Sequence, residues 1–401
     1  MSLTKRLFVF AGAALSLSTA AMAQSTTLDQ SRSYASDLMA DASTRTSSLA
    51  PAAQDFTVNV HGYTQFRYNM TWRDDSGLDD NTAVGFQNAR TDVNLSGNIG
   101  NENWGYFVQW QFSDNESDGG GSASLNDAYG TYKMGNGWAI RFGQFKLPLF
   151  RAELVGDTYQ LFVDRWVGNT FYSQGRSQGI QASYEGDQFR FAMAFSDGIR
   201  TANTDYESPI EADYAFTGRG EFKWAGDWKQ SRDFTSFRNS DFFGMIGAAG
   251  HYQSGGDTVG TDDVSFWALT ADVSIEGNGW NAFAAFYWND TDPEFGDSFQ
   301  DFGIQAQGGI FVSESWELAL GWSVLIPDTD RTGDDVFNTI QLGANYYFIP
   351  ESHAVKGSID FLYFVDKQST CDIAIPNTLT GLLATGEDSE WTLRAQIQLM
   401  F

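Results

Sequence analysis

The 401-residue chain lacks several features that define common classes of protein. Its one cysteine, Cys371, has no partner in the chain, which excludes a small fold held together by internal disulfide bridges. Only 24 lysines and arginines face 51 aspartates and glutamates, and the resulting net charge of -27 excludes nucleic acid as a partner. No run of 18 or more apolar residues follows residue 23, so the mature chain predicts no membrane-spanning helix.

Residue types that support catalysis are also scarce. The three histidines, His61, His251 and His353, fall in three distant segments, and the chain has no Gly-x-Ser-x-Gly motif. Because a hydrolase needs a base beside its nucleophile, this pattern argues against an enzyme. No cluster of histidine and cysteine predicts a bound metal. We therefore expect a protein that is not an enzyme and that needs no cofactor.

The first 55 residues differ in composition from the rest of the chain. Residues 1–23 predict a cleaved secretory signal peptide, because a basic start, a short apolar run and an Ala-x-Ala ending follow one another. Residues 24–55 are rich in serine, alanine and threonine, which predicts a periplasmic linker. A short helix is the alternative for this linker, since leucine or alanine recurs every seven residues from Leu28 to Leu49.

From residue 56 onward, apolar and polar residues alternate in sixteen segments. The last segment, EWTLRAQIQLMF, has an apolar residue at every second position and mostly polar residues between them. A period of two predicts a strand with one apolar and one polar face. A soluble sandwich buries the apolar face, whereas a membrane barrel exposes it to lipid. The signal peptide and the aromatic content of 15% favour a barrel, whose two rims carry aromatic girdles.

The connections between these segments predict how the strands run. Short connections alternate with long polar ones, which is typical of outer-membrane barrels with short periplasmic turns and long external loops. The clear short connections are 100–103, 135–137, 185–187, 276–279 and 313–315. The stretch 225–241 falls where a short turn is expected, and the sequence offers no reason for its length. The predicted fold is an all-β transmembrane antiparallel barrel of about 16 strands over residues 56–401.

The end of the chain predicts how the barrel closes. An unpaired strand edge in lipid would leave backbone groups unsatisfied, so the last strand is expected to pair with the first. Trp391 and Phe401, on the apolar face of the last strand, are the predicted closure residues. Phe401 would then lie in the aromatic girdle at the periplasmic interface.

Two stretches carry a resemblance to a known family. Residues 86–112 and 125–150 resemble the phosphate-selective porin O/P family of Gram-negative outer membranes, through Arg90, the run Asn-Asp-Ala-Tyr at 126–129 and the run Gly-Gln-Phe-Lys-x-Pro-x-Phe at 143–150. The resemblance implies a trimer of 16-stranded channels in the outer membrane, with the third long loop folded into each lumen. It is not extended to phosphate specificity, because no arginine-rich pore wall is evident in the sequence.

The third long connection, residues 146–177, is accordingly the predicted constriction loop after the fifth strand. The eight long connections together hold 32 acids and 8 bases, but this one holds four bases against three acids. Its apolar side chains would let it pack against the barrel wall. The predicted constriction residues are Lys146, Arg151, Glu153, Asp157, Asp164, Arg165 and Arg176.

Strand parity predicts which charged side chains line the lumen. The predicted lining residues are Arg67, Arg90, Asp127, Lys133, Arg141, Arg190 and Arg219. Charged rings of this kind set the ion preference of a pore. The alternative is that neighbouring carboxylates neutralise these bases, which would then serve to hold the wall together.

The function expected from these features is that of an outer-membrane porin for the passive diffusion of small hydrophilic solutes and ions. A structural or adhesive barrel without an open channel is the alternative. The expected partners are outer-membrane lipid, the transported solutes, two further copies of the chain in a homotrimer, and divalent cations at the acidic loops.

Overall fold

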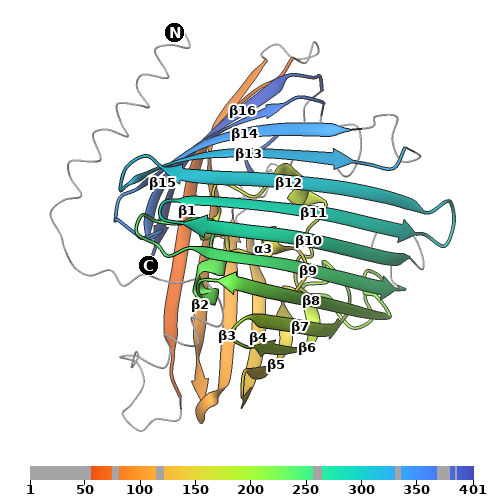
Figure 1. Cartoon of the computed structure of the whole chain (residues 1–401). Helices are drawn as coiled ribbons and strands as arrows, with labels where there is room; N and C mark the ends of the chain where they lie inside the picture. Colours follow the sequence, from red (N-terminus) through yellow and green to blue (C-terminus); the bar gives the residue numbers. More distant parts are fainter. Residues whose placement is uncertain are drawn as a thin grey trace.

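The computed structural model describes residues 56–74, 81–113, 122–255, 264–329, 336–367, 380–383 and 386–401. In this part of the chain, sixteen antiparallel strands form a closed barrel (Figure 1), in which each strand pairs with its neighbours in sequence. The prediction of a transmembrane antiparallel barrel of about 16 strands is confirmed. The predicted signal peptide 1–23, the linker 24–55 and Cys371 lie outside the described residues.

The strands follow one another around the barrel in chain order. They are β1 (Asn59–Trp72), β2 (Thr82–Ile99), β3 (Asn101–Ser113), β4 (Ser122–Gly135), β5 (Trp138–Phe145), β6 (Ser177–Glu185), β7 (Phe189–Ser196), β8 (Tyr214–Ala225), β9 (Phe243–Ser254), β10 (Ser265–Gly277), β11 (Trp280–Asp292), β12 (Phe299–Phe311), β13 (Trp316–Ile326), β14 (Phe337–Tyr347), β15 (Val355–Phe364) and β16 (Glu390–Met400). Short helical turns are α3 (Arg151–Leu154), η3 (Asp157–Tyr159), η4 (Val167–Thr170) and η5 (Trp228–Arg232). Within the described ranges, no helix is long and apolar enough to cross a membrane.

The alternation of the sequence becomes an alternation of exposure along each strand. In β13, Leu318 and Leu320 are 45% and 59% exposed on the outer surface. Glu317 and Ala319, which point into the lumen, are 0% and 7% exposed. The apolar side chains face the hydrocarbon of the membrane, and the polar side chains face the lumen. This is the reverse of a soluble protein, which buries its apolar side chains.

Strands β1 and β16 close the barrel, and their pairing extends to the final residue. Trp72 lies opposite Trp391 in the register, and Tyr63 lies opposite Met400. Beyond this pair, the backbone N–H of Gly62 donates to the carbonyl of Phe401 at 2.7 Å, and the N–H of Phe401 donates back at 2.9 Å. The backbone of Phe401 therefore completes the ladder that removes the sheet edge.

The two ends of the barrel differ in the length of their connections. At the end where the described barrel begins and ends, the connections are mostly short turns, such as Asn136-Gly137, whose φ angles of 51° and 83° suit a tight hairpin. Residues 226–242 are the exception at this end, and their side chains fold inward: Phe234 is 4% and Ser236 is 2% exposed. This connection is long because it forms a folded element inside the barrel, which the sequence did not predict.

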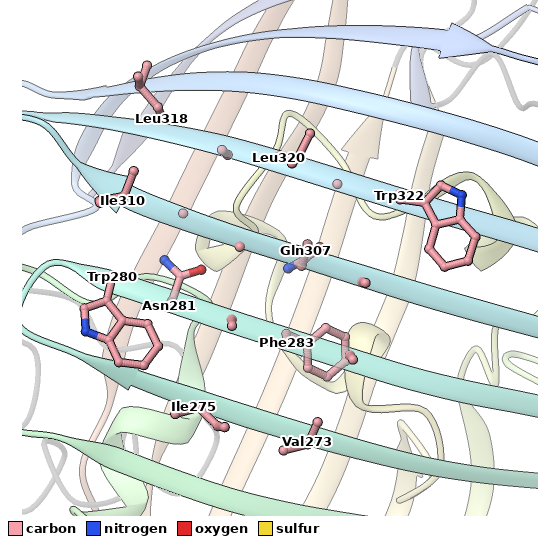
Figure 2. Close-up of a pocket in the computed structure, with 17 residues that line it drawn as sticks. Val273, Ile275, Trp280, Asn281, Phe283, Gln307, Ile310, Leu318, Leu320 and Trp322 are labelled. Carbon is pink, nitrogen blue, oxygen red and sulfur yellow. The ribbon is translucent and has the colours of Figure 1, made fainter.

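In the part of the chain that the structure describes, a broad hollow with a volume of about 760 Å³ lies over β10 to β13 of the outer wall (Figure 2). Small outward residues form its floor, and larger ones such as Trp280 and Trp322 rise at its sides. The floor residues are Ala282, Ala284, Ala306 and Gly308. Because this hollow faces away from the lumen, it is separate from any passage through the barrel.

The outward placement of Leu320, in the middle of β13, predicts a large cost for a charge there. Leu320→Arg should lower the free energy of unfolding by about 2–4 kcal/mol, since the cation would meet hydrocarbon near the bilayer midplane. Leu320→Met is the control and should cost less than about 1.5 kcal/mol. Guanidinium titration in lipid vesicles measures both. Equal losses for the two variants would show that this side chain does not face lipid.

Candidate functional site

Residues 146–176, which join β5 to β6, lie inside the barrel rather than above it. Most of their apolar side chains are buried, with Leu147, Leu149 and Val155 all 0% exposed. In Figure 1 the helical turn α3 of this segment is seen within the ring of strands. An apolar segment in this position is stable because it covers lumenal wall instead of remaining in water. We call residues 146–176 the lumenal loop.

Glycines on the inner face of the wall make room for aromatic side chains of the lumenal loop. A Cβ atom added to Gly321 of β13 or to Gly343 of β14 would lie 3.0 or 2.8 Å from the ring of Phe162. On β12, a Cβ at Gly303 would lie 2.8 Å from Tyr172. Such distances are too short for packed carbon atoms, so only glycine admits these rings. Sequence analysis missed this signal, which consists of glycines at polar-face positions of consecutive strands.

Polar side chains of β14 and β15 satisfy backbone carbonyls of the lumenal loop. The ammonium of Lys356 donates to the carbonyls of Thr158 at 3.2 Å and Gln160 at 3.0 Å. The amide of Asn345 donates to the carbonyl of Leu161 at 2.8 Å. Buried carbonyls of an irregular segment need such partners because they have no ladder of their own. The loop is therefore fixed to this side of the wall by packing and by hydrogen bonds.

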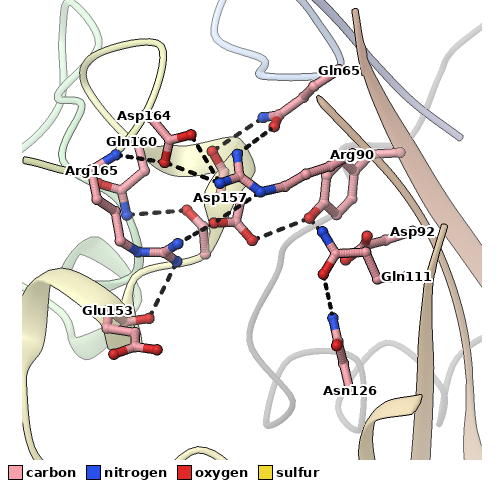
Figure 3. A network of polar contacts seen from close by, with 12 residues as sticks. Gln65, Arg90, Asp92, Gln111, Asn126, Glu153, Asp157, Gln160, Asp164 and Arg165 are labelled. Carbon is pink, nitrogen blue, oxygen red and sulfur yellow. Dashed lines mark hydrogen bonds and ion pairs between the residues drawn. The ribbon is translucent and has the colours of Figure 1, made fainter. Parts of the chain in front are cut away.

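Ion pairs attach the lumenal loop to β1 and β2. Asp164 accepts from Arg67 of β1 at 3.2 Å. It also accepts from Arg90 of β2 at 2.9 Å, and Arg165 pairs with Asp157 inside the loop (Figure 3). Burial by itself would raise the pKa of Asp157, but Arg165 and then Arg90 outweigh it and hold that pKa well below the ordinary value. For Asp164, Arg90 and Arg67 likewise outweigh burial and lower the pKa. Both carboxylates are therefore ionised at neutral pH.

The structure separates the seven predicted constriction residues into two groups. Arg151, Glu153 and Asp164 are buried at 1%, 5% and 4% exposure. The other four are partly exposed on the lumenal loop, namely Lys146, Asp157, Arg165 and Arg176. Arg176 pairs with Asp127 of β4 at 3.2 Å, and Lys146 donates to the carbonyl of Glu153 at 2.9 Å.

Inward-facing side chains that remain partly exposed follow the wall from β2 to β7. Polar members of this set are Arg90, Asn94, Gln109, Gln111, Thr131, Lys133, Arg141, Ser183 and Arg190. On the opposite wall, inward residues such as Gln305, Gln341 and Arg394 are buried, at 3%, 6% and 0% exposure. The accessible inner surface of the barrel is thus one-sided, and it faces the partly exposed residues of the lumenal loop.

The predicted lining residues also differ in how they are paired. Arg219 is buried between Glu221 and Asp272, at 2.8 Å from each, and Arg190 pairs with Glu221. The guanidinium of Arg141 instead lies 4.4 Å from the centre of the Tyr129 ring. In the described ranges, no carboxylate lies within 4.0 Å of Arg141 or Lys133.

A family model described as phosphate-selective porin O and P matches residues 58–291, which is more than half of the chain. The chain belongs to this family. It is therefore an outer-membrane porin, a channel through which solutes diffuse, as the sequence predicted. No curated protein sequence matches this porin.

Solved structures share the fold of this porin at low sequence identity. An anion-selective porin from Comamonas acidovorans has a TM-score of 0.60 and 14% identity, with 86% of this chain and 100% of that chain covered. The outer membrane channel DcaP of Acinetobacter baumannii has a TM-score of 0.59, 14% identity and coverage of 86% and 97%. OmpT of Vibrio cholerae has a TM-score of 0.56, 14% identity and coverage of 88% and 99%.

The ring of Phe162 packs against the wall at Gly343, so a larger side chain at this glycine should displace the lumenal loop. Gly343→Leu should push the lumenal loop away from β14 and toward the accessible wall, because the new side chain occupies the space of the ring, at a cost of about 1–3 kcal/mol. We expect a lower single-channel conductance in planar bilayers.

The matched control is Gly218→Leu on the outer face of β8, where an added Cβ meets no atom within 4 Å. This variant should keep the conductance of the original porin. A Gly343→Leu porin with unchanged conductance would contradict the packing of the lumenal loop on β14.

Proposed function

We propose that the lumenal loop is the constriction of this porin and that solutes pass between it and the wall formed by β2 to β7. The single observation that supports this route is the one-sided exposure of the lumen: many inward polar side chains of β2 to β7 are partly exposed, whereas inward polar side chains of β12 to β16 are buried. A narrow passage lined by fixed polar groups lets charge and size select the solute.

The charges beside this passage favour anions weakly. Lys146, Arg165 and Arg176 of the loop face a wall that carries Arg90, Lys133 and Arg141. Several of these cations are balanced by Asp157, Asp164 and Asp127, so the excess of positive charge is small. The one-sided set of bases agrees with the anion selectivity named for the Comamonas acidovorans porin. The paired arginines do not form a row of free donors, and we therefore propose a general anion preference rather than tight phosphate binding.

The acidic external loops act against this preference at the mouth. Outside residues 146–177, the long connections hold 29 acids and 4 bases. Charges in water are screened within about 8 Å at physiological salt, whereas charges in a narrow low-dielectric passage act at close range. We propose that the mouth enriches cations, including divalent cations, and that the constriction offsets this enrichment.

No chemistry on the solute is part of the proposal. The imidazole of His251 lies 2.8 Å from the hydroxyl of Thr217, which would resemble a base and nucleophile. Both residues are buried, at 1% and 2% exposure, so a solute has no access to them. Among the residues that the structure describes, no group of three or more His, Cys, Asp or Glu side chains could hold a metal ion.

A homotrimer in outer-membrane lipid is the proposed assembly. It rests on the family and on a structural neighbour, OmpT of Vibrio cholerae, that is described in a trimer form. The apolar outer face of each barrel would be shared between lipid and the neighbouring copies.

Lys146 gives the proposed constriction a dependence on pH. Loss of hydration, then repulsion from Arg165 and Arg176, lowers the pKa of Lys146 to about 8. The side chain is therefore charged below that pH and becomes neutral above it. Raising the pH from 6.5 to 9.5 should shift the reversal potential in a salt gradient toward cations, as measured in planar bilayers.

Two substitutions of Lys146 distinguish the effect of its charge on the reversal potential from the effect of other groups that titrate in the same pH range. Lys146→Gln should show the cation shift already at pH 6.5, and Lys146→Arg should remove most of the pH dependence because arginine stays charged. Lys229→Gln, at an exposed site on a short-turn-end connection, is the control and should behave like the original porin. If Lys146→Gln leaves the reversal potential unchanged at every pH, the constriction lies elsewhere. A barrel without steady conductance would instead favour a structural role.

A further inference from the structure

The connection between β8 and β9, residues 226–242, is a folded element at the short-turn end of the barrel. Asp227 caps the turn η5 by accepting from the backbone N–H of Lys229 at 2.8 Å, and Gln230 accepts from the N–H of Asp227 at 2.9 Å. Three of its inner residues, Ser231, Phe234 and Ser236, are 1%, 4% and 2% exposed. A connection at the surface of the barrel would leave such residues in water. We call residues 226–242 the inner brace.

The inner brace contacts the lumenal loop directly. The backbone N–H of Phe234 donates to the carbonyl of Tyr159 at 3.2 Å. The guanidinium of Arg151 donates to the carbonyl of Ser231 and lies 5.8 Å from the centre of the Phe234 ring. Arg151 is 1% exposed, and within the described chain no carboxylate lies within 4.0 Å of it. The inner brace is therefore one of the partners that stabilise this buried charge.

The opposite face of the inner brace rests on the wall from β11 to β14. The ring of Phe234 lies 4.6 Å from that of Phe283 in β11, measured between centroids. The ring of Phe237 lies 5.4 Å from that of Phe311 in β12 and 5.0 Å from that of Tyr347 in β14. Aromatic pairs at these separations attract one another beyond their burial of area. The brace thus fills the space between the lumenal loop and this wall.

The start of the inner brace reaches the edge of the accessible surface. The indole N–H of Trp228 donates to the carbonyl of Gly186 at 2.8 Å. Arg190 of β7 stacks over the Trp228 ring at 4.5 Å and donates to the hydroxyl of Ser231 at 3.1 Å. Arg190 is also one of the partly exposed inward residues of the β2–β7 wall. The brace therefore spans the lumen from the wall beside the passage to the wall opposite.

We propose that the inner brace is a positioning element: it supports the lumenal loop from the short-turn end and so fixes the width of the passage. This inference rests on the proposed function, in which the lumenal loop forms the constriction. The loop is held by hydrogen bonds to β14 and β15 and by ion pairs to β1 and β2, but the residues near Arg151 and Tyr159 face the brace. Without the brace, Arg151 would lose its hydrogen bond to Ser231 and Tyr159 would lose its bond from Phe234, so this part of the loop would be held less firmly.

The test compares two phenylalanines of the same element. Phe234→Ala removes the ring that lies between Arg151 and Phe283, whereas Phe237→Ala removes a ring that stacks on wall residues and on His353. We expect Phe234→Ala to raise single-channel conductance by roughly one half and to increase open-state current noise, because a mobile loop widens a narrow passage. Phe237→Ala should act in the same direction, because it removes the contact of the brace with β12 and β14. Phe191→Ala is the control, since this ring is 40% exposed on the outer face of β7, and it should keep the original conductance. Thermal unfolding of the three variants shows whether they lose similar stability.

The outcomes separate this inference from the proposed function. If the original porin conducts and Lys146→Gln shifts its selectivity, but Phe234→Ala keeps the conductance and noise of the original porin, the positioning role is wrong and the constriction stands. If Lys146→Gln has no effect on selectivity, the proposed constriction itself is wrong. Should Phe234→Ala fail to insert, Phe234→Leu retains an apolar side chain and lacks the ring beside Arg151. Original conductance and noise in that porin would equally overturn the positioning role.

Discussion

The requirement that every backbone polar group in hydrocarbon has a partner within the protein determines this structure. A sheet meets that requirement only when it has no free edge, and the bonds between Gly62 and Phe401 complete the closure at the seam. Once the sheet is closed, its two faces have different surroundings, lipid outside and a lumen inside. The period of two in the sequence is the direct expression of this difference, since each strand supplies both faces in alternation.

Closure creates a second problem, because a barrel of this size encloses more space than its own inward side chains fill. In the porin, connections from both ends of the barrel occupy most of this space. The lumenal loop enters from the end with long connections, and the inner brace enters from the other end. Several charged residues that become buried in the process are paired, as Arg394 is with Asp360 at 2.6 Å and Arg67 is with Asp164 at 3.2 Å. A buried charge without such a partner would cost several kcal/mol.

The alternation of apolar and polar residues in the sequence predicted the features of the barrel that depend on neighbouring residues in a strand. Strand number, the alternation of outward apolar and inward polar residues, and the pairing of the last strand with the first follow from the period of two and from the need for closure. Contacts across the lumen were not predictable in this way, because they join residues far apart in sequence. The glycines that receive Phe162, the burial of Arg151 and the fold of residues 226–242 all depend on which segment lies opposite. An inward glycine on several neighbouring strands is the one local sign that a segment packs there.

The same pairing rule that stabilises the lumen also decides which charges can act on a solute. A guanidinium bound to a carboxylate, such as Arg219 between Glu221 and Asp272, contributes little net field a short distance away. The cations that remain effective include two whose partners are neutral, Arg141 beside Tyr129 and Lys146 beside a backbone carbonyl. They lie on the accessible side of the lumen, one on the wall and one on the lumenal loop. The proposed constriction of a chain with a net charge of -27 can therefore be weakly positive, because 29 acids fall in long connections other than residues 146–177 and Asp157, Asp164 and Asp127 are in ion pairs.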